Sequence, residues 1–238
     1  MRARGRGIRW LALATAVSVG TFLFLHSAAF RVQTVTVEGT SRLGTAEVRA
    51  LLGLDPGAYL WRADPEALAE RLRQHPLIAQ ARVTRVWPRG LRVQVRERVA
   101  SAIVGYYRYY LALDTQGVAL EMVDSLNALD LPLITGADAP WAVLGEVYPS
   151  AAVNPPLQII ASLAPERRRQ IEELHVDGAG DITLYLAGGR RVLWGQAERL
   201  QEKTAALQTI LLDAEKKKLN LLYIDLRYRG QPVVKLKE

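Results

Sequence analysis

The stretch that decides the fold of the first half of this chain is IAQARVTRVWPRGLRVQV, residues 78–95. Two runs rich in β-branched residues, Ile78 to Val86 and Leu91 to Val95, are joined by Trp87-Pro88-Arg89-Gly90. In the second run, apolar residues at 91, 93 and 95 alternate with polar residues at 92, 94 and 96, which is the period of a half-buried strand. The stretch therefore predicts two strands joined by a tight turn, with one apolar face turned toward a core.

Two helices and a further strand are predicted before this stretch. Asp64 can cap a helix whose first position is Pro65, where the missing N–H costs nothing. An earlier helix is predicted with Thr45 as its N-cap, and a strand from Val32 to Glu38 precedes it. The order β-α-α-β-β predicts a small sheet covered by two helices, which we place at residues 32–100.

The N-terminus has the pattern of a membrane anchor. Four arginines, at positions 2, 4, 6 and 9, precede an uncharged run from Trp10 to Ala29. About 20 helical residues suffice to cross the ~30 Å hydrocarbon core. The positive-inside rule then makes residues 1–9 a cytoplasmic tail and residues 10–30 the transmembrane helix, with the rest of the chain outside the cytoplasm.

A cleaved secretory signal is the alternative reading of the same segment, because it has an arginine-rich start, an apolar middle and small residues at positions 27–29. The length of the apolar core and the aromatic residues at its two ends, Trp10 and Phe30, favour a retained anchor.

Composition excludes several classes of function. The chain has no cysteine, which rules out disulfides, thiolate metal sites and a cysteine nucleophile. Its net charge is +7, but the four N-terminal arginines account for most of it and leave +3 for the remainder. Basic residues there are mixed with acidic ones, as at Glu70, Arg71 and Arg73, so we expect no nucleic-acid partner.

After residue 100 the pattern changes to short strands separated by turns. The predicted strands are 102–104, 109–113, 118–122, 171–176, 182–186, 191–194, 220–227 and 232–236. A loop is expected at 131–136, and helices at 157–163 and 197–215. Residues 101–238 are therefore predicted to form a mainly antiparallel β-domain with a late helix, and the fold class is α+β.

No catalytic or metal-binding constellation stands out. His26, His75 and His175 do not pair at metal-ligand spacing. Ser162, His175 and Asp177 could be assembled into a triad, but no G-x-S-x-G motif surrounds the serine. We therefore expect no catalytic residues, no metal site and no cofactor.

Several short motifs together resemble the FtsQ/DivIB family of bacterial cell division proteins. The first half is similar to a POTRA domain, with V-T-V-E-G at 35–39, H-P-L-I-A-Q-A-R-V at 75–83, V-W-P-R-G-L-R-V at 86–93 and Glu97-Arg98. The second half is similar to the β-domain of the family, with Leu113-Asp114, Gly117, the loop 131–136 and Y-I-D-L-R-Y at 223–228. Val99 departs from the family pattern, which has proline after the Glu-Arg pair.

The resemblance implies a non-enzymatic protein of the cytoplasmic membrane at the division septum. It implies complexes with FtsB/DivIC-like and FtsL-like membrane proteins, which would link early division proteins to late ones. Two other interpretations stay open: an anchored cell-wall enzyme with an unrecognised active site, and a POTRA-bearing component of outer-membrane assembly or secretion. The last would need a barrel of long amphipathic strands, which the short strands around the predicted helix at 197–215 do not supply.

The last segment is predicted to be an edge strand, because proline is tolerated at its start and a lysine guards it against promiscuous pairing. An open edge can accept a strand from a partner. Asp225 and Arg227, two residues apart on the preceding strand, can pair with each other or with neighbouring residues, and a role in structure or recognition is favoured over catalysis. The alternative for Tyr228 is that it packs against its own sheet. The expected partner-binding residues are Arg227, Tyr228, Pro232, Val233, Val234, Lys235 and Leu236.

Overall fold

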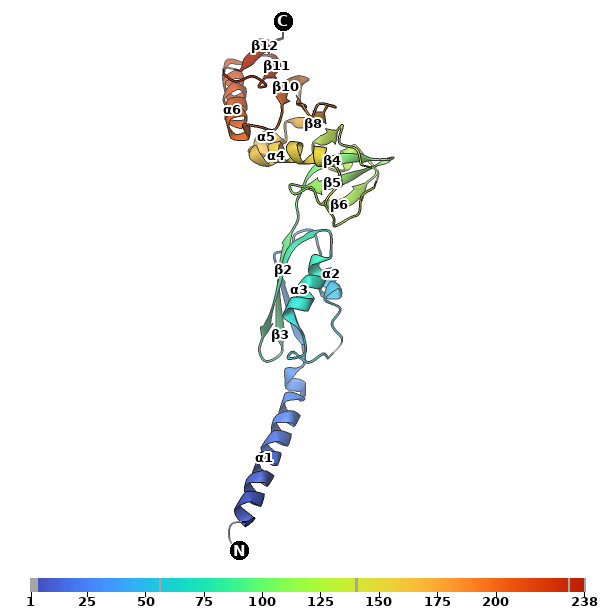
Figure 1. Ribbon diagram of the computed structural model, residues 1–238, viewed down its shortest axis with the longest axis vertical. Helices are drawn as coiled ribbons and strands as arrows, with labels where there is room; N and C mark the ends of the chain where they lie inside the picture. The colour runs from blue at the N-terminus through green and yellow to red at the C-terminus, as the bar shows by residue number, and fades with distance from the viewer. Residues whose placement is uncertain (1–3, 56, 140, 231, 238) are drawn as a thin grey trace. The chain divides into compact units, whose positions relative to one another are not determined.

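The structure, a computed structural model, describes residues 4–55, 57–139, 141–230 and 232–237. The chain divides into two compact units, the first ending at Glu97 and the second beginning at Arg98. Figure 1 labels the helices and strands of both units. Residues 1–3 of the expected cytoplasmic tail lie outside the described residues.

The N-terminal helix, α1 (Arg4–Leu25), is followed by the 3-10 turn η1 (Ala28–Phe30). The expectation of one continuous helix over residues 10–30 is therefore wrong at its C-terminal end. The chain leaves the helical path at Ser27, whose backbone is extended with ψ of 162°. In the part of the chain that the structure describes, no helix combines the length and the apolar character needed to cross a membrane.

The first unit confirms the predicted β-α-α-β-β order. Its three-stranded sheet has the order β1-β3-β2, with β1 parallel and β2 antiparallel to β3. Along β3 the odd-numbered residues from 91 to 95 are buried and the even-numbered ones from 92 to 96 are exposed, as the alternation predicts. The elements are β1 (Thr34–Glu38), α2 (Thr45–Leu52), α3 (Pro65–Arg73), β2 (Ile78–Val86) and β3 (Gly90–Glu97).

The predicted N-cap is confirmed for α3 and is wrong for α2. The Asp64 carboxylate accepts a hydrogen bond from the N–H of Glu66 at 3.1 Å, and Pro65 is the first helical residue, as predicted. For α2 the N-cap is Gly44, and Thr45 is already inside the helix. The extended backbone of Gly44, with ψ of 144°, makes the turn that was expected at the threonine.

The second unit is built on one nine-stranded sheet with the order β12-β11-β10-β9-β8-β7-β4-β5-β6. Most neighbours are antiparallel, which confirms the predicted character of the domain. The strands are β4 (Ala100–Tyr106), β5 (Tyr109–Asp114), β6 (Ala119–Val123), β7 (Leu133–Thr135), β8 (Ile171–Val176), β9 (Ile182–Leu186), β10 (Arg190–Gly195), β11 (Leu221–Asp225) and β12 (Val233–Leu236).

Strand β7 corrects the expectation of a loop at residues 131–136. It has three residues and runs parallel to both β4 and β8, so it joins the two halves of the sheet. Its central residue, Ile134, is buried. Three residues are too few to show an alternation, which is why the sequence pattern reads as a loop.

Helices α4 (Asn154–Ser162), α5 (Pro165–Arg168) and α6 (Leu200–Lys217) belong to the second unit, together with the 3-10 turns η2 (Leu126–Ala128) and η3 (Ala151–Val153). Helix α6 begins at residue 200 rather than at 197, because Arg199 has a left-handed backbone with φ of 52°. The core contains the fully buried Trp194 and apolar residues of the sheet, α4 and α6, among them Ile159, Leu184 and Leu207.

Two glycines in the family-like motifs are required by close backbone contacts. At Gly39 a Cβ atom would lie 2.1 Å from the carbonyl oxygen of Val95, and at Gly136 it would lie 1.9 Å from that of Val176. Both glycines also have left-handed backbones, with φ of 85° and 75°. Any side chain at either position would push two neighbouring segments apart.

Candidate functional site

Strand β12 is the terminal strand of the nine-stranded sheet, at the end of the second unit (Figure 1), and among the described residues its neighbour in the sheet is β11. All four of its residues are exposed, including Val233 at 54% and Leu236 at 46%. Pro232 lies immediately before the strand and is half-buried. Residues 233–236 of the expected set therefore lie on the outermost strand of the sheet, which has no second neighbouring strand among the described residues.

Backbone hydrogen bonds show which groups of β12 face outward. The N–H of Lys237 donates to the carbonyl of Asn220 at 2.7 Å, so it points toward the preceding strand. Successive residues of a strand direct their N–H and C=O groups to opposite edges. The backbone groups of Lys235 therefore face β11, and those of Val234 and Leu236 point to the open side.

A hydrogen bond on the β10 side of β11 gives the same assignment of inward and outward backbone groups. The N–H of Leu226 donates to the carbonyl of Leu193 in β10 at 2.9 Å. By the same alternation, the N–H of Asp225 faces β12, opposite Val233. The two hydrogen bonds thus agree on the phase of the ladder between β11 and β12.

The side chains of β12 lie on two different faces. Val234 is directly opposite the buried Ile224, so Val234 and Leu236 lie on the core side of the sheet. Val233 and Lys235 lie on the other face. A strand added to this edge would meet apolar side chains on the core side and one valine and one lysine on the opposite side.

Arg227 is held in place by Asp225, which is one of the two pairings that the sequence allows. Its Nε and Nη2 atoms donate to the two oxygens of the Asp225 carboxylate at 3.0 and 2.7 Å, and its backbone N–H donates to the same carboxylate at 3.0 Å. The hydrogen bonds from the Arg227 side chain lower the pKa of Asp225, although burial opposes them. The stem of Arg227 packs over Gly195.

Tyr228 does not pack against its own sheet, because its side chain is 70% exposed. The guanidinium carbon of Arg227 lies 5.6 Å from the centroid of its ring. The two residues form one exposed aromatic and cationic pair that follows β11, and such residue types dominate the energetics of many protein interfaces.

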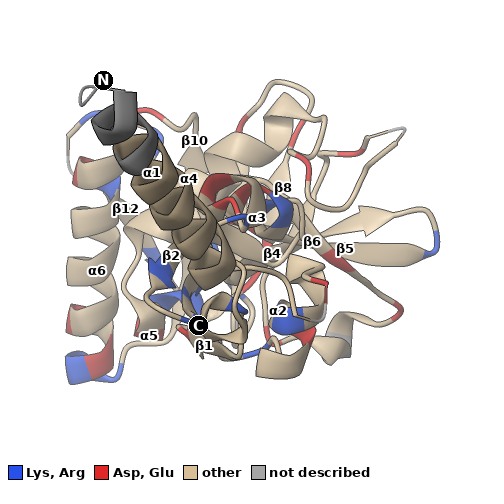
Figure 2. Ribbon diagram, turned by 90° about the horizontal axis from the view of Figure 1, so that it is seen from below, with Lys and Arg blue, Asp and Glu red and all other residues tan. Residues whose placement is uncertain are grey.

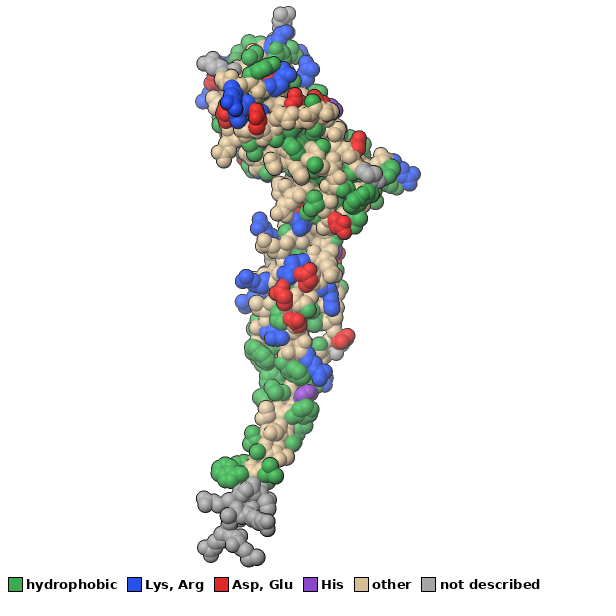
Figure 3. All heavy atoms as spheres, in the orientation of Figure 1, with side chains coloured by type: hydrophobic (Ala, Val, Ile, Leu, Met, Phe, Trp, Pro, Cys, Tyr) green, Lys and Arg blue, Asp and Glu red, His purple; other side chains and the backbone are tan. Residues whose placement is uncertain are grey.

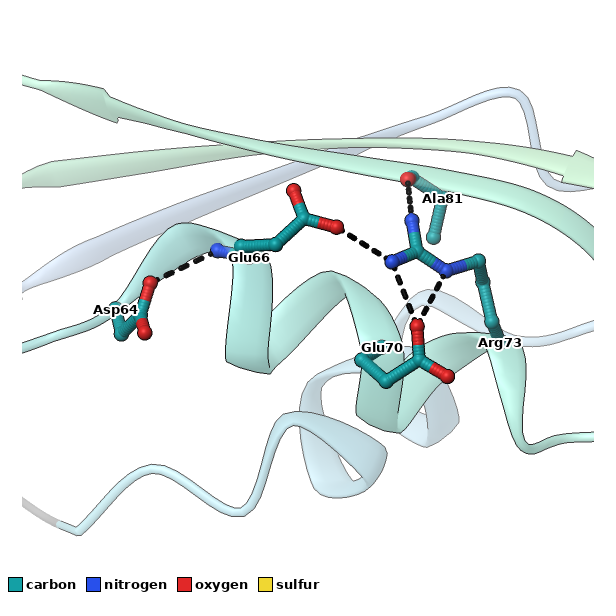
Figure 4. Close-up of polar contacts among 5 residues, drawn as sticks. All are labelled: Asp64, Glu66, Glu70, Arg73 and Ala81. Carbon is teal, nitrogen blue, oxygen red and sulfur yellow. Dashed lines mark hydrogen bonds and ion pairs between the residues drawn. The ribbon is translucent and has the colours of Figure 1, made fainter.

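The charged cluster of the first unit ties α3 to β2 (Figure 4). The side chain of Arg73 donates to Glu66, to Glu70 at 2.7 Å and to the carbonyl of Ala81 at 3.3 Å. The hydrogen bonds that Arg73 donates to the two glutamates raise its pKa. Both carboxylates are engaged by one cation, so the cluster stabilises the packing of the helix on the sheet. Beside it is a cavity of about 440 Å³, lined by Arg73, Gln80, Ala81, Arg82, Gln94, Val95 and Arg96.

The residues of the hypothetical triad are engaged separately. The hydroxyl of Ser162 donates to the carbonyl of Ile159 at 2.7 Å, and the ring of His175 bonds to Thr135 at 2.8 Å. The Asp177 carboxylate accepts backbone N–H groups of its own turn. Among the described residues, no group of three or more His, Asp or Glu side chains is arranged to hold a metal ion.

Charges of both signs are mixed on α6 (Figure 2). Lys217 pairs with Asp213 at 2.9 Å, and Glu215 pairs with Arg167 of α5. The hydrogen bond from Arg167 lowers the pKa of Glu215. The three lysines at 216–218 close the helix, as expected from their sequence position.

Glu97 anchors a loop of the first unit, a role that its place in the sequence does not indicate. Its carboxylate accepts hydrogen bonds from the N–H groups of Ser41, Arg42 and Leu43 and from the Ser41 hydroxyl, at 2.7–3.0 Å. Burial raises the pKa of Glu97, but these hydrogen bonds outweigh it and lower the pKa to about 2. The next residue, Arg98, donates to the buried Asp114 at 2.6 Å within the second unit.

Lys203 is the other residue that the sequence did not single out. It lies inside the second unit, and its Nζ atom donates to the carbonyls of Trp194 at 2.7 Å and Gln196 at 2.8 Å. Burial lowers the pKa of this lysine. Its position on the buried face of α6 could have been found from the helical period, since it precedes Leu207 by four residues.

Comparison with known proteins gives matches over both units. Residues 30–98 match the model of the POTRA domain, FtsQ-type, and residues 102–227 match that of the C-terminal region of cell division protein FtsQ/DivIB. Strand β12 lies beyond the second match.

Two relatives match nearly the whole chain. Cell division protein FtsQ of Anaeromyxobacter sp. (strain K) is 34% identical over 92% of this chain and 75% of its own length. Cell division protein FtsQ of Syntrophotalea carbinolica is 32% identical over 95% of this chain and 80% of its own length. A solved structure, the major extracytoplasmic domain of the trans isomer of DivIB from Geobacillus stearothermophilus, covers 50% of this chain and 96% of that domain at 16% identity and a TM-score of 0.37.

Proposed function

The chain belongs to the FtsQ/DivIB family of cell division proteins, and from this premise we propose that it is a non-enzymatic scaffold of the division machinery. Its role is to bind other division proteins and so to link those that arrive early at the septum with those that arrive late. The partners are FtsB/DivIC-like and FtsL-like membrane proteins.

The observation that carries this proposal is the open edge at β12. Val234 and Leu236 direct their backbone donors and acceptors away from the sheet, and Arg227 and Tyr228 lie exposed in the segment that joins β11 to β12. A partner segment in extended conformation can add to such an edge as a further strand. Backbone hydrogen bonds would then supply affinity, and contacts with the flanking side chains would supply discrimination.

The proposed location is the cytoplasmic membrane, with a single pass and the N-terminus in the cytoplasm. The uncharged segment from Trp10 to Ala29 supports this, since its large apolar side chains in α1 are exposed around the helix. The POTRA domain, residues 32–100, and the β-domain, residues 101–238, would then lie outside the cytoplasm. A mature protein whose N-terminal sequence begins at position 29 or 30 would contradict the anchor.

The decisive experiment compares two substitutions of one residue in the full chain. Val234→Pro removes an outward N–H and leaves the ladder to β11 intact, because that N–H faces away from it. Val234→Ala keeps the N–H and shortens the side chain. Binding of the purified FtsB-like partner should weaken about tenfold or more in the proline variant and less in the alanine variant.

Circular dichroism and the melting temperature of both variants must match the unaltered chain. A folded proline variant that binds the partner with unchanged affinity would refute strand addition at this edge.

A further inference from the structure

The C-terminal end of α1 is capped by aromatic side chains of the first unit. The indole N–H of Trp61 donates to the carbonyl of Leu25 at 3.1 Å, and the hydroxyl of Tyr59 donates to the carbonyl of His26 at 3.0 Å. Leu25 is the last residue of α1 and His26 follows it, so neither carbonyl has a donor within the helix. The His26 ring lies 5.4 Å from the Tyr59 ring and 5.3 Å from the Trp61 ring.

Two arginines lie against these rings. The guanidinium carbon of Arg31 is 5.6 Å from the centroid of Tyr59, and that of Arg62 is 4.9 Å from the centroid of Trp61. Both arginines are exposed. Within the described residues, no carboxylate oxygen lies within 4.0 Å of either guanidinium group. Their charges are therefore available to an anionic ligand.

An exposed indole extends the apolar surface of α1 onto the first unit. Trp87, in the turn between β2 and β3, is 56% exposed, and its ring centroid lies 6.1 Å from that of Phe30. Phe30 in turn lies 5.1 Å from Phe24 of α1. Figure 3 shows hydrophobic side chains continuing from α1 onto the adjoining end of this unit, with basic groups beside them.

We propose that these residues, Arg31, Tyr59, Trp61, Arg62 and Trp87, form a collar that binds the outer surface of the membrane. The two arginines bind the phosphates of anionic phospholipids, and Trp87 enters the boundary between headgroups and acyl chains, where indole rings are favoured. The inference rests on the proposed anchor, which places the collar at the interface. It assigns to the first unit a lipid contact in addition to its covalent link to α1.

The geometry explains why these residue types occur together. The polar atoms of Tyr59 and Trp61 donate hydrogen bonds to carbonyls at the C-terminal end of α1, and the faces of the two rings remain available for stacking. A guanidinium group stacked on a ring keeps its charge and its five N–H donors, which suit a phosphate. The stack thus orders each arginine before a lipid binds, which reduces the entropy lost on binding.

The test uses the full chain reconstituted into phosphatidylcholine vesicles, with and without phosphatidylglycerol, in which some lipids carry brominated acyl chains that quench tryptophan fluorescence. Trp87→Phe and Trp10→Phe variants are compared with the unaltered chain, so that each difference isolates one indole. Both Trp10 and Trp87 should be quenched, the latter more strongly when phosphatidylglycerol is present.

The first unit is called docked when its Trp87 is in contact with the membrane, and Trp87 quenching reports the ratio of docked to undocked molecules. Replacing both Arg31 and Arg62 with glutamine should lower this ratio about fivefold for each arginine removed. The matched control, Arg82→Gln with Arg96→Gln, removes the same charge from exposed positions of the sheet and should leave Trp87 quenching unchanged.

The outcomes separate the collar from the anchor. Quenching of Trp10 without quenching of Trp87 would overturn the collar and leave the anchor standing, whereas quenching of Trp87 alone would overturn the anchor. Absence of both signals would overturn both proposals. Trp87 quenching that is insensitive to phosphatidylglycerol and to the two arginines would refute binding to anionic phosphates.

Discussion

Replacing Glu97 with glutamine should destabilise the first domain by ~2 kcal/mol. The carboxylate accepts four hydrogen bonds from the loop at residues 41–43, and each of its oxygens accepts two of them. Lowering a pKa from 4.5 to about 2 corresponds to ~3 kcal/mol of stabilisation at neutral pH. Glutamine keeps one acceptor oxygen but turns an NH₂ group toward the N–H of Arg42, so most of this free energy should be lost.

The pH dependence has a definite sign. The pKa of Glu97 is lower in the folded state than in the unfolded state, so its stabilisation is complete above pH 4.5 and is lost as the pH falls toward 2. The difference in the free energy of unfolding between the unaltered chain and Glu97→Gln should therefore be constant near neutral pH and shrink on acidification.

The assay is urea unfolding of the full chain in detergent micelles, combined with hydrogen exchange at the amides of residues 41–43. Exchange of these amides should accelerate in Glu97→Gln. The matched control is Glu66→Gln, which removes an exposed carboxylate paired with Arg73 and should cost less than ~1 kcal/mol. Equal stability of the Glu97→Gln variant and the unaltered chain, or a difference that persists unchanged at pH 2, would refute the reasoning.

Three further outcomes are expected. Tyr228→Ala should leave the melting temperature unchanged, because the side chain is exposed, and should weaken binding of the FtsB-like partner by ~2 kcal/mol in titration calorimetry. Lys203→Met should lower the free energy of unfolding by ~1–3 kcal/mol, because it leaves the carbonyl of Trp194 without its donor. Since burial lowers the pKa of Lys203, the unaltered chain should gain stability as the pH rises toward 10.5, and the methionine variant should not show this gain. Gly136→Ala should lower the melting temperature and cost ~2 kcal/mol or more, because its Cβ would meet the carbonyl of Val176.

Local sequence signals predicted those parts of the fold whose cause lies within a few residues. Asp64 and Pro65 define the start of α3, because capping involves only the first turn of a helix. Strands β8 and β9 have the bounds that their patterns predict. The start of α6 was misplaced because the left-handed backbone of Arg199 has no signature in residue type.

The candidate site was predicted in part. Pro232 and Lys235 indicated an edge strand. The spacing of Asp225 and Arg227 allowed them to pair with each other or with neighbours, and the structure shows the first of these. Which N–H groups point outward could not be read from the sequence, since a shift of one residue would reverse the phase of the ladder. The exposure of Tyr228 and the arginines stacked at the end of α1 also depend on segments distant in the chain.

Residue patterns alone predicted the order of elements in the first unit, the two-part organisation of the motifs and the membership of the family, because periodicity, capping residues and turn glycines act over short distances along the chain. Three features became visible in the folded chain alone: β7 joins the two halves of the large sheet, Glu97 is bonded to a loop 54–56 residues earlier, and β12 has no neighbour on its outer side among the described residues. Each of these features depends on which segments meet in space. Hydrogen bonds across such distances follow from how the whole core closes and leave no periodic trace in either segment.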